Sequence, residues 1–301
     1  MLLWLLIVIL SYILFGVASF GDKLVLSRSP NPKLYTFYVG ALSSLAALLI
    51  PFAGFHVPDA KSFFWIAMTS LVIIAGLYVL YSAIAKFDVS RVIPIVGAVQ
   101  PILVLLLSWF FWGSGAVTLN NVLAFSILLL ASGIISFDKK LELNKNLLIL
   151  SLIASFLAAL GLIFIKMVFL RQAFLQGTIW IGIFNLLLVL TFFFNKNFRK
   201  EIFSKNSAPD KKTLSVGLLT QLAGGAATFS QNFAISLAPV YSLAIINALR
   251  GIQYVFLFLI TLFFSGFFPN ILKERISKRI IIQKTIALLL IVLGLVLLFI
   301  W

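Results

Sequence analysis

The chain consists mostly of long apolar runs separated by short polar stretches. Ten such runs fall at residues 2–21, 34–54, 62–86, 90–113, 119–137, 147–170, 176–194, 213–237, 240–266 and 280–301. An α-helix needs about 20 residues to cross the ~30 Å hydrocarbon core of a bilayer, whereas the strands of a transmembrane barrel alternate apolar and polar positions. The pattern therefore predicts an all-α polytopic membrane protein with ten transmembrane helices.

The composition agrees with a membrane protein and narrows its chemistry. Hydrophobic residues make up 62% of the 301 residues, charged residues make up 10%, and the mean hydropathy is +1.17. The chain has no cysteine, which excludes disulfides, thiolate metal sites and thiol nucleophiles, and its lone histidine, His56, lies in a predicted loop. We therefore expect no bound metal and no cofactor. The first run has no basic start and stays apolar to Gly21, which predicts a retained helix rather than a signal peptide.

Basic residues gather in the short segments between the apolar runs. The formal net charge is +15, but this clustering is typical of charge beside a membrane rather than of a nucleic-acid surface. Segments that follow odd-numbered runs contain 19 Lys and Arg residues, against three on the other side. Because positive charge marks the cytoplasmic side, we expect both termini on the outer side of a multi-pass protein of the cell (inner) membrane. The opposite orientation, with both termini in the cytoplasm, stays open.

The two halves of the chain contain related segments. GVASFGDKLVLSR matches AALGLIFIKMVFLR and aligns Lys23 with Lys166 at an offset of 143 residues, and AIAKFDVSRVIPI matches AISLAPVYSLAII. The first match joins runs 1 and 6, and the second joins runs 3–4 and 8–9, so each half contains five helices. Since five is odd, the second half must enter the membrane the other way up. We expect two inverted five-helix repeats, residues 1–140 and 141–301.

Three segments of the first half and one of the second carry a resemblance to a known family. These are FGVASFGDKLVL, VIPIVGAVQPILVLLLSWFFWG, VTLNNVLAFSILLLASGIIS and ISKRIIIQKTIALLLIVLGLVLLF. Over nearly its full length the chain resembles the ten-helix EamA-type branch of the drug/metabolite transporter superfamily. The resemblance implies transport of small metabolites, often amino acids or related compounds. It also implies cytoplasmic termini, which is opposite to the charge count.

The chain departs from that family in three places. Ser114 stands where a glutamate is usual, the second half has no proline that matches Pro101, and residues 267–279 lengthen a loop. Small cation exporters of the same superfamily depend on a membrane glutamate in their first helix. The corresponding stretch here, IVILSYILFG, contains no acid, which disfavours cationic drugs as substrates.

An arginine interrupts the ninth apolar run, in the stretch INALRGIQY. Asn247, Arg250, Gln253 and Tyr254 follow spacings that place them on one face of a helix. An arginine at the bilayer centre costs about 2.5–3.5 kcal/mol on insertion scales, so it needs a partner, a wet cavity or a ligand. No carboxylate lies deep in a predicted helix, and we expect Arg250 to attract a carboxylate or phosphate of a solute. In the alternative reading, Arg250 hydrogen-bonds the carbonyls of a kinked neighbouring helix and braces the fold.

Further polar and aromatic residues in other runs are candidates for the same site. Gln100 precedes Pro101, which removes a helical hydrogen bond and kinks the fourth helix. The other candidates are Gln231, Asn232, Tyr12, Tyr78 and Tyr81. For each of these side chains, packing between helices is the competing explanation.

These observations predict a transporter that works by alternating access between the two repeats. The expected partners are the bilayer and a small solute that bears a carboxylate or phosphate, with no nucleic acid. A non-transporting scaffold, a lipid scramblase or a cation or drug exporter of the same superfamily are the alternatives. An enzyme is not expected, because paired carboxylates, histidine metal sites and activated nucleophiles are missing from the runs. The identity of the solute, the direction of transport, any coupling ion and the oligomeric state, with a homodimer as one option, stay open.

Overall fold

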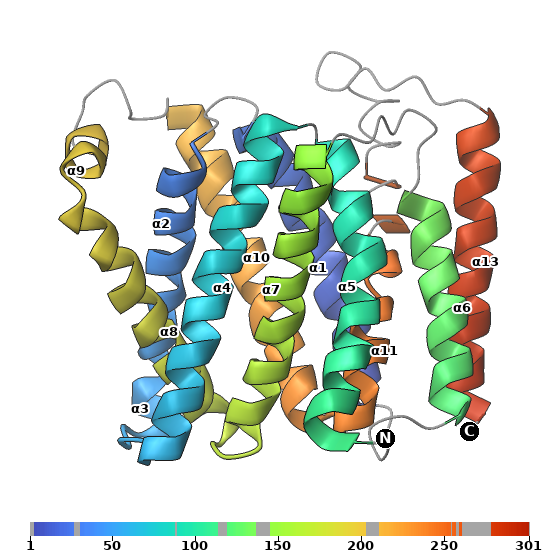
Figure 1. The fold of residues 1–301 in the computed structure, drawn as a ribbon, viewed down its shortest axis with the longest axis horizontal. Helices are drawn as coiled ribbons and strands as arrows, with labels where there is room; N and C mark the ends of the chain where they lie inside the picture. Colours follow the sequence, from blue (N-terminus) through green and yellow to red (C-terminus); the bar gives the residue numbers. More distant parts are fainter. Residues whose placement is uncertain are drawn as a thin grey trace.

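The computed structural model describes residues 3–26, 31–87, 89–113, 119–136, 145–202, 211–253, 255–256, 259–260 and 278–300. Every regular element within these residues is a helix. The long helices stand side by side in one bundle (Figure 1). Helix α1 begins and helix α13 ends at the same end of the bundle, which we call the lower end, and we call the opposite end the upper end, as drawn in Figure 1.

The helices follow the predicted apolar runs closely. In the first half they are α1 (Leu3–Leu26), α2 (Pro32–Leu42), η1 (Ser43–Leu49), α3 (Ile50–Ala53), α4 (Ala60–Lys86), α5 (Val89–Trp112) and α6 (Leu119–Ser136). In the second half they are α7 (Lys145–Phe169), α8 (Phe174–Leu190), η3 (Thr191–Phe194), α9 (Lys196–Ile202), α10 (Lys211–Leu237), η5 (Val240–Ser242), α11 (Leu243–Ala248) and α13 (Lys278–Ile300). Helix α1 continues to Leu26, past the predicted end at residue 21.

Six helical segments of the described chain are long and apolar enough to cross a membrane. They are Leu3–Asp22, Pro32–Ala53, Ala60–Lys86, Ile95–Trp112, Lys145–Phe169 and Phe174–Phe194. These segments correspond to six of the predicted runs, and α6, α10 and α13 correspond to three others, with α10 and α13 each beginning two residues early. The protein is therefore an all-α membrane protein, as the apolar pattern predicts. The uninterrupted helix predicted over residues 240–266 is wrong, because in the described part of that range η5 and α11 are followed by a turn at residues 249–250, and helix resumes at Gly251.

Local sequence signals set several helix ends. The side chain of Asn31 accepts a hydrogen bond from the backbone N–H of Leu34 at 3.1 Å, and Pro32 follows as the first helical residue of α2. Asp59 caps α4 in the same way through the N–H of Ser62 at 3.3 Å. That hydrogen bonding to Ser62 holds the pKa of Asp59 below its ordinary value of 3.8. Gly54 ends α3 with a positive φ of 72°.

Small residues let two pairs of helices approach closely. Helix α1 packs along α10, where a Cβ added to Gly21 would lie 1.9 Å from the Oγ1 of Thr220. Helix α4 packs along α7, where a Cβ on Gly76 would lie 3.3 Å from the Cβ of Leu157. Glycine at such contacts brings two helix backbones together where no hydrophobic effect drives association. These two seams hold the first half of the chain against the second.

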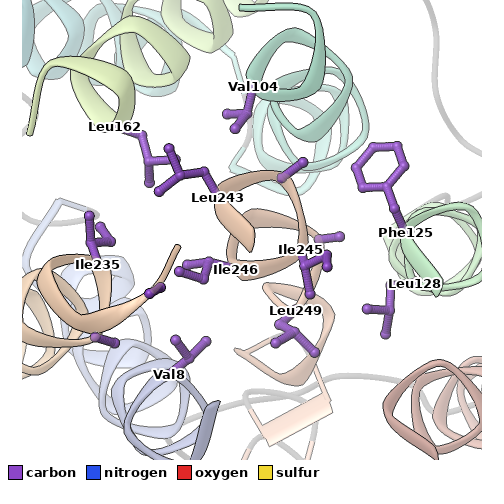
Figure 2. Packing of buried hydrophobic residues seen from close by; sticks show 14 of the residues in the cluster. Val8, Val104, Phe125, Leu128, Leu162, Ile235, Leu243, Ile245, Ile246 and Leu249 are labelled. Carbon is purple, nitrogen blue, oxygen red and sulfur yellow. The ribbon is translucent and has the colours of Figure 1, made fainter. Parts of the chain in front are cut away.

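Helix α11 lies at the centre of the largest buried cluster. Figure 2 shows its side chains surrounded by residues of five other helices. These neighbours include Val8 of α1, Val104 of α5, Phe125 and Leu128 of α6, Leu162 of α7 and Ile235 of α10. The short helix is therefore enclosed by both halves, and the chain that follows it leads to Arg250.

Candidate solute site at the break after α11

The chain leaves the regular α-helix at Leu249 and Arg250. The N–H of Arg250 bonds to the carbonyl of Asn247 at 3.1 Å, and the N–H of Gln253 bonds to the carbonyl of Arg250 at 3.0 Å. These bonds span three residues instead of four, which is the tighter pattern often found where a helix is interrupted. Helix resumes directly afterwards, at Gly251. The break places Arg250 at a tight turn in the interior of the bundle.

Arg250 is held by a neutral side chain from α5. Its Nη1 donates a hydrogen bond of 2.5 Å to the Oε1 of Gln100, which is 2% exposed and lies near the middle of α5. Pro101 follows Gln100 and has no N–H, so the carbonyl one turn earlier in α5 loses its helical donor. Each half of the chain therefore contributes one helix irregularity, the proline of α5 and the turn at Arg250. The hydrogen bond between Gln100 and Arg250 joins the two.

The positive charge of Arg250 has no carboxylate partner in the described part of the chain. A guanidinium has five N–H donors, and Gln100 uses one of them. The alternative in which Arg250 braces loose backbone carbonyls is not what the structure has, because its bond goes to a side-chain amide. The remaining donors are available to an anion or to water.

Asn247 lies one helical turn before Arg250 and is fully buried. Neither its Oδ1 nor its Nδ2 has a hydrogen-bond partner. Leaving a buried polar group unpaired costs about 1–3 kcal/mol, and such groups in proteins usually face water, an ion or a ligand. The unpaired amide of Asn247 and the uncompensated charge of Arg250 therefore mark the same short segment as a candidate binding site.

Gln253, predicted on the same helical face as Arg250, bonds to a different helix. Gln253 donates from its Nε2 to the Oγ of Ser19 in α1 at 2.8 Å. Arg250 reaches α5 instead, so the predicted single polar face contacts both α1 and α5. Tyr254 lies outside the described residues.

The three candidate tyrosines outside the ninth run have different surroundings. Tyr12 is buried and donates its O–H to the backbone carbonyl of Ile246 at 2.7 Å, which ties α1 to α11 beside the site. Tyr78 is 45% exposed, in an outward stripe of α4 with Phe64 and Leu71. Tyr81 is buried, and its ring packs edge-on against Tyr35 of α2 with centroids 4.8 Å apart. The structure thus places Tyr12 against α11, and no described hydrogen bond or ring contact joins Tyr78 or Tyr81 to Arg250.

Gln231 and Asn232 lie on α10, close to its lower end. Asn232 is buried, and the Nε2 of Gln231 is a buried donor without a partner. No contact joins either residue to Arg250. They stay candidates for a wall of the site that α10 would contribute.

Sequence reasoning missed the role of Lys166. It is expected near the outer end of its helix, yet it is 3% exposed. Its Nζ donates to three backbone carbonyls at the lower end of α10, those of Ile235 (2.9 Å), Ser236 (3.4 Å) and Ala238 (2.5 Å). The signal that could have found it is the isolated lysine within an apolar stretch, IFIKMVF.

Comparisons with known proteins give information on the fold only. No protein-family model matches this chain, and no curated protein matches it. The chain matches 28 chains of solved structures. One of them, described only as "Crystal structure of protein", has a TM-score of 0.70 and 13% sequence identity, and the match covers 97% of this chain and 94% of that one. A likeness at such low identity establishes a shared fold and no shared activity. The class that fold and composition define is an all-α membrane protein.

Proposed function

We propose that this protein carries a small solute with a carboxylate or phosphate group across the membrane, by alternating access. The observation that carries the proposal is Arg250, which sits at a helix break in the bundle interior with a neutral amide as its partner. Broken helices that meet near mid-membrane are where secondary transporters place their substrate sites.

The proposed architecture has ten membrane-crossing helices in two inverted repeats, residues 1–140 and 141–301, of the EamA type. Two observations support it. Helix α1 begins and α13 ends at the same end of the bundle, as an even number of crossings requires (Figure 1). Such a repeat would relate α1 to α7 and α4 to α10. It would therefore exchange the two tight seams, α1 with α10 and α4 with α7. The charge bias puts the lower end on the outer side of the cell membrane.

The proposed solute class follows from the donors at the site. A guanidinium binds a carboxylate or phosphate through two parallel hydrogen bonds. The amide of Asn247 supplies one further donor and one acceptor, both unpaired. An anionic group would therefore neutralise the charge of Arg250. A cationic drug would meet repulsion at the same place, so the exporter alternative is disfavoured.

Reconstitution tests the proposal directly. The purified protein is first screened for a rise in melting temperature with amino acids, organic acids and sugar phosphates, because a ligand of the folded state stabilises it. Uptake of the best ligand is then measured in proteoliposomes. We expect uptake by the unchanged protein and loss of uptake with Arg250→Gln.

The matched control is Arg171→Gln, which removes an exposed arginine from the turn between α7 and α8. It should transport like the unchanged protein. Normal insertion and normal uptake with Arg250→Gln would overturn the proposed site. Absence of solute uptake together with lipid flipping in the same vesicles would favour the scramblase instead.

A further inference from the structure

A second polar centre lies at the upper end of the bundle, where α1, α2, α4 and α10 meet. The Nε2 of Gln221 in α10 donates to the Oη of Tyr35 in α2 at 2.7 Å. The O–H of Tyr35 in turn donates to the Oδ1 of Asp22 in α1. The buried Tyr81 of α4 packs its ring against Tyr35 and lies within electrostatic reach of Asp22. Four helices therefore contribute to one hydrogen-bonded group around a single carboxylate.

The described groups that face Asp22 are all neutral. Tyr35 and Tyr81 are the titratable ones among them, and α10 contributes Gln221 and Thr220. Lys33, in the first turn of α2, lies over the rings of Phe192 and Phe198 at 5.6 and 5.1 Å. The side chain of Lys23 is outside the described residues. A half-buried carboxylate is costly while it is ionised if, as among the side chains that the structure describes, no counter-ion faces it, and taking up a proton removes that cost.

The same group lies beside a tight contact between the two halves. Gly21, directly before Asp22, is the residue at which an added Cβ would collide with Thr220. One turn earlier on α1, Ala18 faces Gly224 of α10, with 3.6 Å between its Cβ and a Cβ built on the glycine. The chain from Gln221 through Tyr35 to Asp22 thus links α10 of the second half to α1 and α2 of the first half. Any motion that opens the upper end between these helices must break it.

We propose that Asp22 is a proton-binding site, and that its protonation releases the link between the two halves at the upper end. A hydrogen bond to an ionised carboxylate is roughly twice as strong as one between neutral groups. The ionised form therefore holds Tyr35 and, through it, Gln221. The protonated form holds them less firmly, so α1 and α2 separate from α10 more easily. Coupling of this proton to solute movement rests on the proposed transport function, whereas proton binding itself does not.

Proton binding is tested in detergent, without any solute. The infrared carbonyl stretch of protonated carboxyl groups is followed while the pH of the unchanged protein and of three variants is varied. We expect Asp22→Asn to remove one titrating carboxyl signal. Tyr35→Phe, which keeps the ring and removes the hydroxyl, should move the midpoint of that signal without removing it. A titration that is identical in the unchanged protein and Asp22→Asn would overturn the proposal.

The matched control for this titration is Asp59→Asn, an exposed cap of α4 at the lower end. It should leave the Asp22 signal in place. Tyr35→Phe keeps the test decisive if Asp22→Asn fails to fold. An unmoved midpoint of the carboxyl titration in folded Tyr35→Phe would contradict the proposed link between Tyr35 and Asp22.

Coupling is tested in proteoliposomes with the solute found above. In the unchanged protein a pH difference should drive net uptake, and in Asp22→Asn uptake should fall to the level of exchange without a pH difference. Uptake that follows a sodium gradient and ignores the pH difference would overturn the proton assignment. If the unchanged protein shows no flux at all, the proposed function fails, while the infrared titration still decides whether Asp22 binds a proton.

Discussion

Two charged residues tie α10 to its neighbours, one at each end of the bundle, and they do so in different ways. At the lower end Lys166 of α7 donates to three backbone carbonyls. At the upper end Asp22 of α1 is joined to α10 only through side chains, Tyr35 and then Gln221. Rotation of the Lys166 side chain would break three bonds at once and leave a buried ammonium without partners. Side chains can leave Asp22 by rotation, so the lower contact belongs to the fold and the upper one can open.

The lower contact has a clear physical cause. The last four carbonyls of a helix have no partner inside the helix and carry the negative end of the helix dipole. The N–H of Ala238 satisfies the carbonyl of Ala234, and Lys166 supplies donors to the carbonyls that follow. An ammonium with three donors suits a ring of carbonyls in an apolar setting. The predicted bracing role of a cation in the bundle is thus performed by Lys166 and not by Arg250.

Replacing Lys166 with Met should give the largest effect. It leaves the carbonyls of Ile235, Ser236 and Ala238 without a donor inside the protein, and we expect a loss of about 3 kcal/mol in the free energy of unfolding. Unfolding in mixed micelles with a denaturing detergent measures this loss. Lys61→Met removes an exposed lysine at the same end and should change little. Equal stability of the two variants would contradict the structural role of Lys166.

Replacing Gly21 with Ala should weaken the upper contact by disturbing the packing of α1 against α10. The new methyl group overlaps Thr220 and forces α1 away from α10, at a cost of about 1–3 kcal/mol. The matched control is Gly225→Ala, because a Cβ there meets no atom within 4 Å. Chemical cross-linking between α1 and α10 at the upper end should fall for Gly21→Ala alone. Unchanged cross-linking would show that the seam tolerates the methyl group.

Replacing Tyr35 with Phe should be milder, since it removes one hydroxyl and leaves the ring in place. We expect a loss of about 1 kcal/mol from the hydrogen bonds with Asp22 and Gln221. Tyr38→Phe changes an exposed tyrosine of the same helix and serves as the control. We also expect Tyr35→Phe to speed backbone hydrogen exchange at the upper end of α10 only. That result would show that the upper contact opens independently of the lower contact at Lys166. Uniform exchange along α10 would argue against a local link.

The smallest effect concerns Asp59 and acid pH. Its folded pKa is lowered by hydrogen bonding to Ser62, so the ionised form is the one that the cap stabilises. This contribution is fully present above the ordinary value of 3.8 and is lost as the pH falls through the lower folded value. Thermal unfolding of Asp59→Asn across acid pH should show a slightly flatter dependence than the unchanged protein. A steeper dependence in the variant would contradict the sign.

Much of the fold follows from local pattern. Apolar runs of membrane length predict the six spanning segments, and the cap formed by Asn31 and Pro32 explains why α2 begins two residues before the predicted start at residue 34. Arg250 is recognisable in the sequence as a candidate, because it is the one charged residue in a long apolar run. Its partner was not predictable, since Gln100 is 150 residues away in the sequence. Gln253 likewise meets Ser19 across 234 residues.

The sequence by itself determined that this chain forms apolar helices and that Arg250, Gln100 and Lys166 are polar residues out of place in such helices. Hydrophobic length and spacing are local properties, so they can be read along the chain. Only the tertiary structure decided that Lys166 caps α10, that Arg250 faces a neutral amide and that Asp22 reaches Gln221 through Tyr35. These pairings depend on which helix faces lie together, and in a membrane they are set by close packing of side chains from distant parts of the chain.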